Sequence, residues 1–131
     1  MNTLLQGMRA VAEPTRLRVL ALCAHAELTV TELTQILAQS QPRVSRHLKL
    51  LVEAGLLDRF REGTWAFYRM SEEQKCAVLG RTIVDLIPTD DPTITRDLER
   101  LEAVKSARAK QAADYFQDNA KQWDQIRSLH V

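Results

Sequence analysis

The chain contains few of the residues that build turn-rich or cross-linked folds. Of its 131 residues, four are glycine, four are proline, two are cysteine and 5% are aromatic. So little glycine and proline excludes collagen-like and low-complexity chains and disfavours an all-β fold with many tight turns. Two cysteines 53 positions apart provide no disulfide framework, metal ribbon or thioredoxin-like motif. The composition therefore indicates helices, and the length indicates one core.

Long hydrophobic runs are also missing. Apolar runs such as Val19–Cys23 are far too short to span a bilayer, and the first five residues lack the basic segment of a signal peptide. We therefore expect a cytoplasmic protein that has no membrane partner.

Neither sign of charge predominates, since 18 Lys and Arg face 17 Asp and Glu. Taken alone, a net charge of +1 is an argument against nucleic acid as the partner. However, residues 1–69 hold nine basic and six acidic residues, whereas residues 70–131 hold nine and eleven. The basic excess lies between Arg43 and Arg69. Counterion release depends on such local density, so the near-neutral total does not exclude DNA.

Two helices are predicted before residue 27. Apolar residues at helical spacing predict the first over residues 2–12. Pro14 fits the first turn of a second helix, which runs to about Ala26. The residues expected to form the buried stripe of this second helix are Leu17, Leu20, Ala21 and Ala24.

The next two predicted helices are short and follow each other closely. Thr29 and Glu32 are spaced as in a capping box, which predicts a helix over residues 30–39. Ser40 as N-cap and Gly55 as C-terminal stop predict a further helix between them. Two short helices joined by a tight turn form a helix-turn-helix.

After Gly55 the pattern changes to that of strands. Residues 56–61 and 65–70 are short runs that contain aromatic residues around Glu62-Gly63, which predicts a β-hairpin. A helix-turn-helix followed by a hairpin is a winged helix. The expected fold class is therefore mainly α with a small β-hairpin, a winged helix-turn-helix with a long C-terminal helix.

The C-terminal half is predicted to be helical. Ser71-Glu72-Glu73 starts a helix that Pro88 ends, and from Thr93 the chain is expected to be helical almost to its end. A helix of roughly 35 residues spans about 50 Å and needs a partner helix or a further domain to cover its apolar stripe. We expect residues 1–88 to be a DNA-binding and dimerisation domain, and residues 89–131 to be a linker-like or dimer-supporting extension.

The predicted helix after Ser40 has two different faces. Val44, Leu48 and Leu51 should dock on the core. The opposite face carries Pro42, Arg43, Arg46 and Lys49, with Ser45 at its edge. In a major groove these side chains supply cations for phosphates and guanidinium forks for guanine edges. A solvated helix surface is the alternative, but the capped helix before it and the basic hairpin after it favour DNA.

Two further groups of residues accompany that face. His47 lies on the flank of the buried stripe, where it either packs against the neighbouring helix or reaches DNA. The hairpin residues expected to contact phosphates beside the minor groove are Arg59, Arg61 and Arg69, with Gly63 at the tip. Trp65, Phe67 and Tyr68 are expected to anchor this hairpin to the core.

These segments carry a family resemblance. AEPTRLRVL at residues 12–20 and LTVTEL at residues 28–33 look like the first two signature segments of the ArsR/SmtB family of bacterial winged-helix repressors. SQPRVSRHLKLL at residues 40–51, AGL at residues 54–56 and REG at residues 61–63 complete the pattern. The resemblance is continuous over about residues 4–70.

The resemblance implies a homodimer that binds double-stranded DNA. In such a dimer the first and fifth helices form the interface, and the recognition helices enter successive major grooves of a palindromic operator. It also implies repression that an unknown small effector relieves. The base-reading positions would be Gln41, Arg43, Ser45, Arg46 and His47, and further DNA contacts are expected from Thr31, Pro42, Lys49 and the hairpin residues.

The sensing chemistry departs from that of the family. Arsenic-sensing members carry a Cys-Val-Cys where this chain has residues 27–31 without a thiol, and residues 72–87 lack the histidines of the zinc and nickel sensors. Cys23 and Cys76 fall on the two helices that carry the cysteine pair of persulfide-sensing members, but at shifted positions. Redox sensing by this pair is one reading, and two free core cysteines are the other. No metal, cofactor or enzymatic activity is expected.

The C-terminal residues carry a second resemblance. They look like the segment that joins an ArsR-type domain to a methyltransferase domain dependent on S-adenosylmethionine, through Tyr115-Phe116, Ala120, Trp123-Asp124, Arg127 and Leu129-His130-Val131. The alternative function is therefore the DNA-binding part of a fused methyltransferase that responds to an adenosyl compound. A third is a protein-interaction module that uses the long helix. The alternative interpretation of this segment is that Phe116, Trp123 and Ile126 cover the dimer core.

Overall fold

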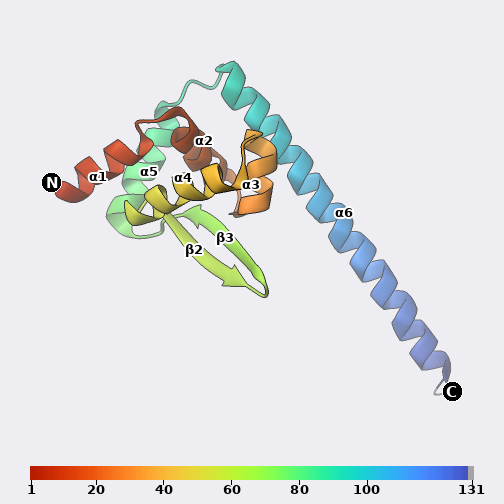
Figure 1. Cartoon of the computed structure of the whole chain (residues 1–131). Coiled ribbons are helices and arrows are strands. Elements are labelled where there is room, and N and C mark those ends of the chain that lie inside the picture. The colour runs from red at the N-terminus through yellow and green to blue at the C-terminus, as the bar shows by residue number, and fades with distance from the viewer. Residues whose placement is uncertain (130–131) are drawn as a thin grey trace. The chain divides into compact units, whose positions relative to one another are not determined.

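The computed structural model describes the backbone of residues 1–129 and the side chains of residues 1–115. The chain divides into two compact units, Met1–Leu98 and Glu99 onward. Its elements, shown in Figure 1, are α1 (Asn2–Val11), α2 (Pro14–His25), β1 (Leu28–Thr29), α3 (Val30–Leu37), α4 (Gln41–Glu53), β2 (Leu57–Glu62), β3 (Trp65–Met70), α5 (Gln74–Leu86) and α6 (Pro92–Leu129).

Local capping determines where the short helices begin. The predicted capping box is confirmed: the backbone N–H of Glu32 donates to the Thr29 hydroxyl at 3.2 Å, and the backbone N–H of Thr29 donates to the Glu32 carboxylate at 2.9 Å. Ala38 then adopts a left-handed conformation with φ 54°, which ends α3 and turns the chain into α4. Ser40 occupies the N-cap of α4, although its side chain makes no capping hydrogen bond.

The hairpin is part of a three-stranded antiparallel sheet with strand order β1-β3-β2. β2 and β3 pair from Leu57–Met70 to Glu62–Trp65, as predicted, and Gly63 at the turn has φ 63°, which favours glycine. β1 was not expected from the sequence, because two residues are too few to show alternation. It pairs Leu28 with Tyr68 and ties the start of α3 to the hairpin. The structure confirms a mainly helical winged helix-turn-helix.

The core is centred on α2, which packs against α1, α4, α5 and β3. Of its predicted stripe, Leu20 and Ala21 are buried, but Leu17 and Ala24 are only partly so. Because other elements pack on several sides of α2, its buried residues are not confined to one stripe. The additional buried apolar residues of α2 are Val19, Leu22 and Cys23.

α1 and α5 pack against each other at a close approach. A Cβ added to Gly7 of α1 would lie 2.6 Å from the Leu79 side chain of α5, so a larger residue at this position would displace Leu79. Both helices nevertheless leave apolar side chains in solvent. Those more than a third exposed are Leu4, Leu5 and Met8 on α1, and Val78 and Leu86 on α5.

The long C-terminal helix is confirmed as α6, whose first turns belong to the first unit. Of the tail resemblance, His130 and Val131 lie outside the described residues, as do the side chains from Phe116 onward. In the part of the chain that the structure describes, no helix combines the length and the apolar character that crossing a bilayer requires.

The start of α6 is joined to α2 by a buried ion pair. Arg18 donates to both carboxylate oxygens of Asp97, from Nε at 2.7 Å and from Nη2 at 2.8 Å. The Asp97 side chain is 2% exposed. The hydrogen bond to Asp97 raises the pKa of Arg18, against the opposing effect of burial. This two-bond geometry makes the pair sensitive to the loss of either partner.

We expect Asp97→Asn to lower the free energy of unfolding by about 3 kcal/mol, because it leaves a largely buried guanidinium without its counter-charge. Glu102→Gln is the matched control, since Glu102 pairs with Lys105 at 3.6 Å on the surface with 72% of its side chain exposed. That change should cost within roughly 0.5 kcal/mol. Urea unfolding of the two variants measures both values. Equal losses would show that the Arg18–Asp97 pair contributes no more than a surface pair.

Candidate nucleic-acid interface

α4 has one buried and one exposed face, as its sequence predicts. Val44, Leu48 and Leu51 are each 0% exposed. They dock α4 against its neighbours α1, α2, α3 and β2. Burying three such side chains contributes roughly 1.5–3 kcal/mol each. This burial fixes the rotation of α4 about its own axis and so determines which side chains face solvent.

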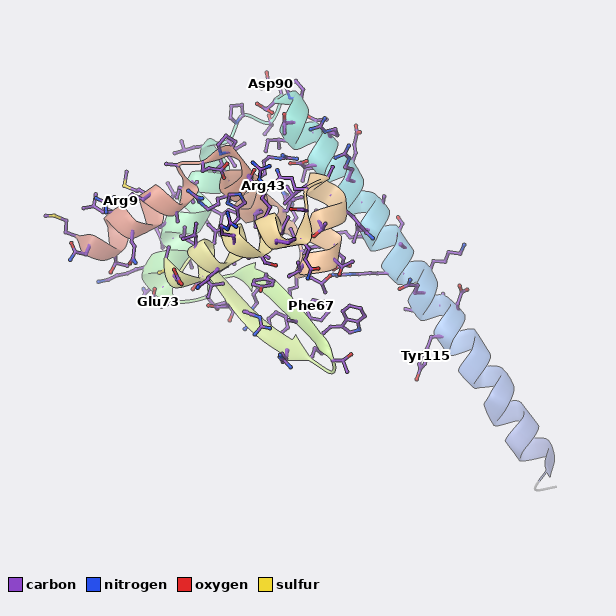
Figure 2. The ribbon with its side chains drawn as sticks, in the orientation of Figure 1. Arg9, Arg43, Phe67, Glu73, Asp90 and Tyr115 are labelled. Atoms are coloured by element: carbon purple, nitrogen blue, oxygen red, sulfur yellow. The ribbon has the colours of Figure 1, made fainter. Side chains whose placement is uncertain are left out.

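The exposed face of α4 is basic. Pro42, Arg43, Arg46 and Lys49 are all exposed, and Ser45 is half-buried at the edge. Lys49 lies 3.9 Å from Glu53 in an exposed pair, whereas Arg43 and Arg46 have no acidic partner within ion-pair distance among the described residues. Figure 2 labels Arg43 on this helix. The two free guanidinium groups are available for phosphates or for the edges of bases.

Two more of the predicted residues are exposed in the first turns of α4 and α3. Gln41 is the first residue of α4 and is exposed. Thr31 is exposed in the first turn of α3. Both therefore lie at helix N-termini, where backbone N–H groups lack helical partners and favour anions.

His47 packs against α2 and is only 14% exposed. Its Nδ1 lies 3.3 Å from Arg16 Nη1 and 3.7 Å from Glu13 Oε2. Arg16 also donates from Nε to the carbonyl of Ala10, and Glu13 caps α2 by accepting from the backbone N–H of Arg16 at 2.9 Å. The three side chains thus connect α1, α2 and α4. A direct contact of His47 with DNA stays a prediction.

The charges around His47 have opposing effects. Burial lowers the pKa of His47, the Glu13 carboxylate raises it, and the guanidinium groups of Arg16, Arg43 and Arg46 lower it further, so the net direction is down. Burial disfavours ionisation of Glu13, but the backbone N–H groups of Arg16 and Thr15 lower its pKa overall. The cluster therefore holds a neutral imidazole beside an ionised carboxylate near pH 7.

The two faces of the hairpin differ. Cross-strand pairing places Arg59 opposite Tyr68 and Arg61 opposite Ala66, so both arginines share the face that carries the buried Tyr68. Arg59 and Arg61 are exposed, and they have no acidic partner in the described part of the chain. Gly63 is exposed at the tip, with open space where a Cβ would be.

The anchoring role predicted for Trp65 is wrong. Trp65 is 58% exposed, because its place beside the turn, opposite Glu62, lies beyond the helices that could cover it. Figure 1 shows the hairpin extending past the helical core. Tyr68, only 9% exposed, does anchor the hairpin. Phe67 is half-buried and stacks on Phe60, with ring centroids 5.6 Å apart (Figure 2).

Arg69 lies at the base of the hairpin, and its charge is engaged within the protein. Its Nη1 is 3.9 Å from Glu27, and its guanidinium carbon lies 4.6 Å from the centre of the Phe60 ring. A cation over an aromatic face gains electrostatic attraction. Arg69 therefore differs from Arg59 and Arg61, whose guanidinium groups are free to meet a phosphate.

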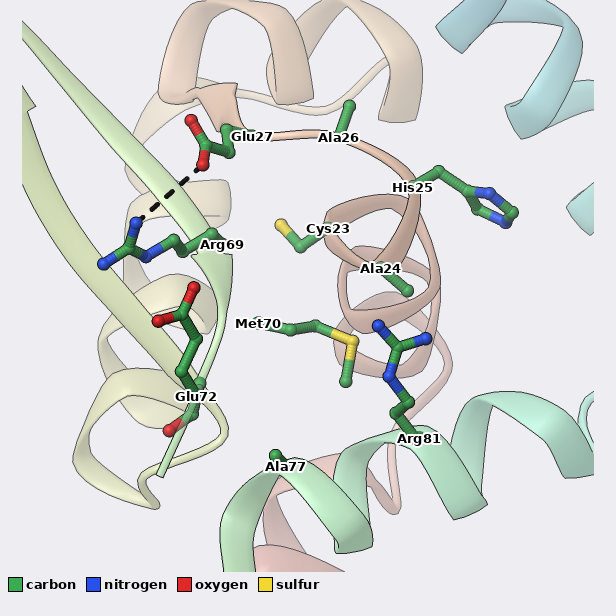
Figure 3. A pocket seen from close by; sticks show the side chains of 11 residues that line it. Cys23, Ala24, His25, Ala26, Glu27, Arg69, Met70, Glu72, Ala77 and Arg81 are labelled. Carbon is green, nitrogen blue, oxygen red and sulfur yellow. Dashed lines mark ion pairs between the residues drawn. The ribbon is translucent and has the colours of Figure 1, made fainter. Parts of the chain in front are cut away.

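Cys23 lines a hollow of about 450 Å³ between α2, β3 and α5. Figure 3 shows its thiol on the side of Arg69, whereas the guanidinium of Arg81 points from α5 toward Met70. Burial raises the pKa of the Cys23 thiol to about 12. The hydrogen bond with Glu73, then burial and the nearby carboxylates, raise the pKa of Cys76. Neither thiol has the lowered pKa of a reactive cysteine.

No metal site is apparent in the described residues. Within them, no three His, Cys, Asp or Glu side chains gather closely enough to hold an ion. The exposed arginines of α4 and the hairpin support electrostatic and hydrogen-bonding recognition of a polyanion. Helical spacing and the local density of basic residues identify the residues of this surface in the sequence. The surroundings of His47, Trp65 and Arg69 depend instead on tertiary contacts.

Comparison with known proteins identifies related sequences. Residues 13–59 match the family described as bacterial regulatory protein, arsR family. The arsenic resistance transcriptional regulator ArsR1 of Pseudomonas putida is 47% identical over 66 residues, which are 50% of this chain and 52% of ArsR1. The arsenical resistance operon repressor of Bacillus subtilis is 32% identical over 79 residues, 60% of this chain and 75% of that repressor. The matched segment thus spans about half the length of ArsR1.

A solved structure shows the same fold. The homodimeric winged helix-turn-helix DNA-binding domain from Mycobacterium bovis, determined by solution NMR, superposes with a TM-score of 0.57 at 27% identity. The superposition covers 63% of this chain and 75% of that domain. The two chains therefore share the winged helix-turn-helix fold.

We expect His47 to make stability depend on pH. The pKa of His47 is lower in the folded protein than in the unfolded chain. The neutral imidazole therefore adds to the free energy of unfolding above about pH 6.5, and this contribution is lost as the pH falls through the folded-state pKa. Between about pH 7.5 and 5, the melting temperature of the wild type should fall more than that of His47→Gln. His25→Gln, which changes an exposed histidine outside the cluster, should follow the wild type. Equal falls in wild type and His47→Gln would contradict this account.

Proposed function

Because this chain belongs to the arsR family of bacterial regulatory proteins, we propose that it is a transcriptional repressor that binds double-stranded DNA as a homodimer and is released by a small effector. α4 is the recognition helix and enters the major groove. The hairpin is the wing and contacts phosphates beside the adjacent minor groove. The transcriptional regulator of Pseudomonas putida and the operon repressor of Bacillus subtilis support the regulatory role, and neither is described as a methyltransferase.

The observation that carries this proposal is the free basic face of α4. Arg43 and Arg46 project from a helix whose inner face is fully buried, and the described residues offer them no acidic partner. A basic side chain on a helix can pair with a carboxylate one turn away, as Lys49 pairs with Glu53 here. A face that leaves two guanidinium groups free, next to a wing with two more, suits the phosphate and guanine groups of DNA.

Dimerisation is supported by the apolar surface of α1 and α5. Leu4, Met8, Val78 and Leu86 are between 51% and 77% exposed, on two helices that contact each other. Exposed apolar side chains grouped on adjacent elements mark association sites. The related domain from Mycobacterium bovis is a homodimer. Two recognition helices related by a two-fold axis would read a palindromic operator with half-sites about one helical turn apart.

The effector should be one that needs no thiolate. Residues 27–31 contain no cysteine, and the pKa values of both thiols are raised. Thiolates are the ligands that soft metal ions select, so a protonated thiol is a poor ligand near neutral pH. We propose that the effector is held by other side chains, and that redox chemistry at Cys23 and Cys76 does not release the repressor.

A salt titration tests the proposal. A duplex selected by the protein from random sequences, and a scrambled duplex of the same composition, are titrated with wild type at several salt concentrations. The affinity for the selected duplex should fall steeply with salt, and sedimentation of the complex should show two chains per duplex. A wild type that did not prefer the selected duplex, or whose affinity ignored salt, would refute the proposal.

Two variants separate base reading from phosphate binding. Arg46→Ala should cost about 1–3 kcal/mol on the selected duplex and relax its specificity. Arg61→Ala should weaken both duplexes equally and reduce the salt slope by about one. Arg96→Ala, which changes an exposed arginine of α6, is the control and should leave both affinities unchanged. If Arg46→Ala preserved the preference, α4 would not be reading bases.

A further inference from the structure

The wing carries an exposed tryptophan that the recognition helix does not account for. Trp65 is the first residue of β3 and is 58% exposed. Tryptophan has the largest side chain to bury, and its indole ring combines an apolar face with an N–H donor. Among the described hairpin residues it is the one large apolar side chain exposed to this extent. An exposed indole of this kind points to a contact with another molecule.

The register of the hairpin places Trp65 on the face opposite Arg59 and Arg61. Trp65 pairs with Glu62, whereas Arg61 pairs with the next residue, Ala66, so the two side chains project to opposite sides. Further down the face of Trp65, Phe60 stacks on Phe67 and Arg69 covers the Phe60 ring. Those aromatic rings are covered by one another and by Arg69. Trp65 extends the same row toward the tip and is left uncovered.

This arrangement gives the tip two kinds of binding group. One face presents guanidinium groups that have no acidic partner in the described part of the chain, and the other presents an indole ring close to the Gly63 turn. Because β2 and β3 are paired along their whole length, the hairpin holds the guanidinium groups and the indole ring on opposite faces of one sheet. A nucleic-acid strand also has two kinds of surface, since its phosphates are anionic whereas its sugar and base rings have apolar faces.

We propose that Trp65 is a DNA-contact residue of the wing, whose indole ring packs on backbone sugars of the duplex, while Arg59 and Arg61 on the opposite face of the hairpin hold phosphates. The proposal rests on the DNA-binding function proposed above and adds a non-ionic contact to it. A protein partner fits less well, because a protein-binding surface has an apolar centre of several residues. Here Trp65 is 58% exposed beside Glu62, whereas Phe60 and Phe67 on the same face stack on each other under Arg69, so the exposed apolar centre is one indole.

The contact predicts an affinity change without a change in salt dependence. Trp65→Ala should weaken binding to selected and scrambled duplexes alike, by roughly tenfold, because it removes the apolar surface that packs on the sugars. Trp65→Phe should recover most of that loss. The slope of log affinity against log salt should stay at the wild-type value, because no cation is removed. Thr64→Ala is the matched control at the neighbouring exposed tip position and should bind like wild type.

A fluorescence measurement locates the contact directly. The sequence has two tryptophans, so Trp123→Phe leaves Trp65 as the sole indole. Its emission should change in intensity or wavelength when duplex saturates the protein. Thermal unfolding of Trp65→Ala should match wild type, since an exposed side chain contributes little to stability.

The outcomes separate this contact from the function on which it rests. If wild type binds the duplex but Trp65→Ala binds equally well and the emission of Trp123→Phe stays unchanged, the Trp65 contact is refuted and the repressor function stands. A reduced salt slope in Trp65→Ala would refute the non-ionic role. If Trp65→Ala lost capture of a protein partner while keeping full DNA affinity, the tip would be a protein-binding surface. If wild type bound no duplex, both proposals would fail.

Discussion

Burial of the inner face of α4 is the constraint on which the proposed interface depends. Val44, Leu48 and Leu51 have no exposed surface, and they can be buried together only when α4 has one rotation about its axis. That rotation turns Arg43 and Arg46 outward. A shift of one residue in the helix would rotate it by about 100°, exposing leucine and burying guanidinium, both of which cost free energy. Packing of the core therefore positions the basic face.

α2 connects α4 to other elements of the first unit through side-chain contacts. At its N-terminal end, Glu13 and Arg16 meet His47 of α4, so the recognition helix is attached to α2 by polar contacts as well as by apolar packing. Two residues after Arg16, Arg18 holds Asp97 at the start of α6 through two hydrogen bonds. A single helix thus contacts both α4 and the start of α6.

Features governed by local chemistry were predictable from the sequence, and features governed by distant contacts were not. The capping box at Thr29, the two faces of α4 and the hairpin turn at Gly63 each depend on residues a few positions apart. The exposure of Trp65 depends on how far the hairpin extends beyond the core, which its sequence does not encode locally. In the same way, the sequence predicts Arg69 as a DNA-contacting cation of the wing but does not show its contacts with Glu27 and Phe60. The wide burial of α2 likewise follows from the number of elements packed around it.

The central claim is that α4 and the wing together form the DNA-binding surface. The most direct test follows the backbone amide signals of the isotopically labelled protein by NMR as a selected duplex is added. The account predicts that the largest changes fall on residues 41–49 and 59–65, with smaller ones along α1 and α5. Large changes confined to α5 or α6, with the signals of residues 41–49 unmoved, would contradict it.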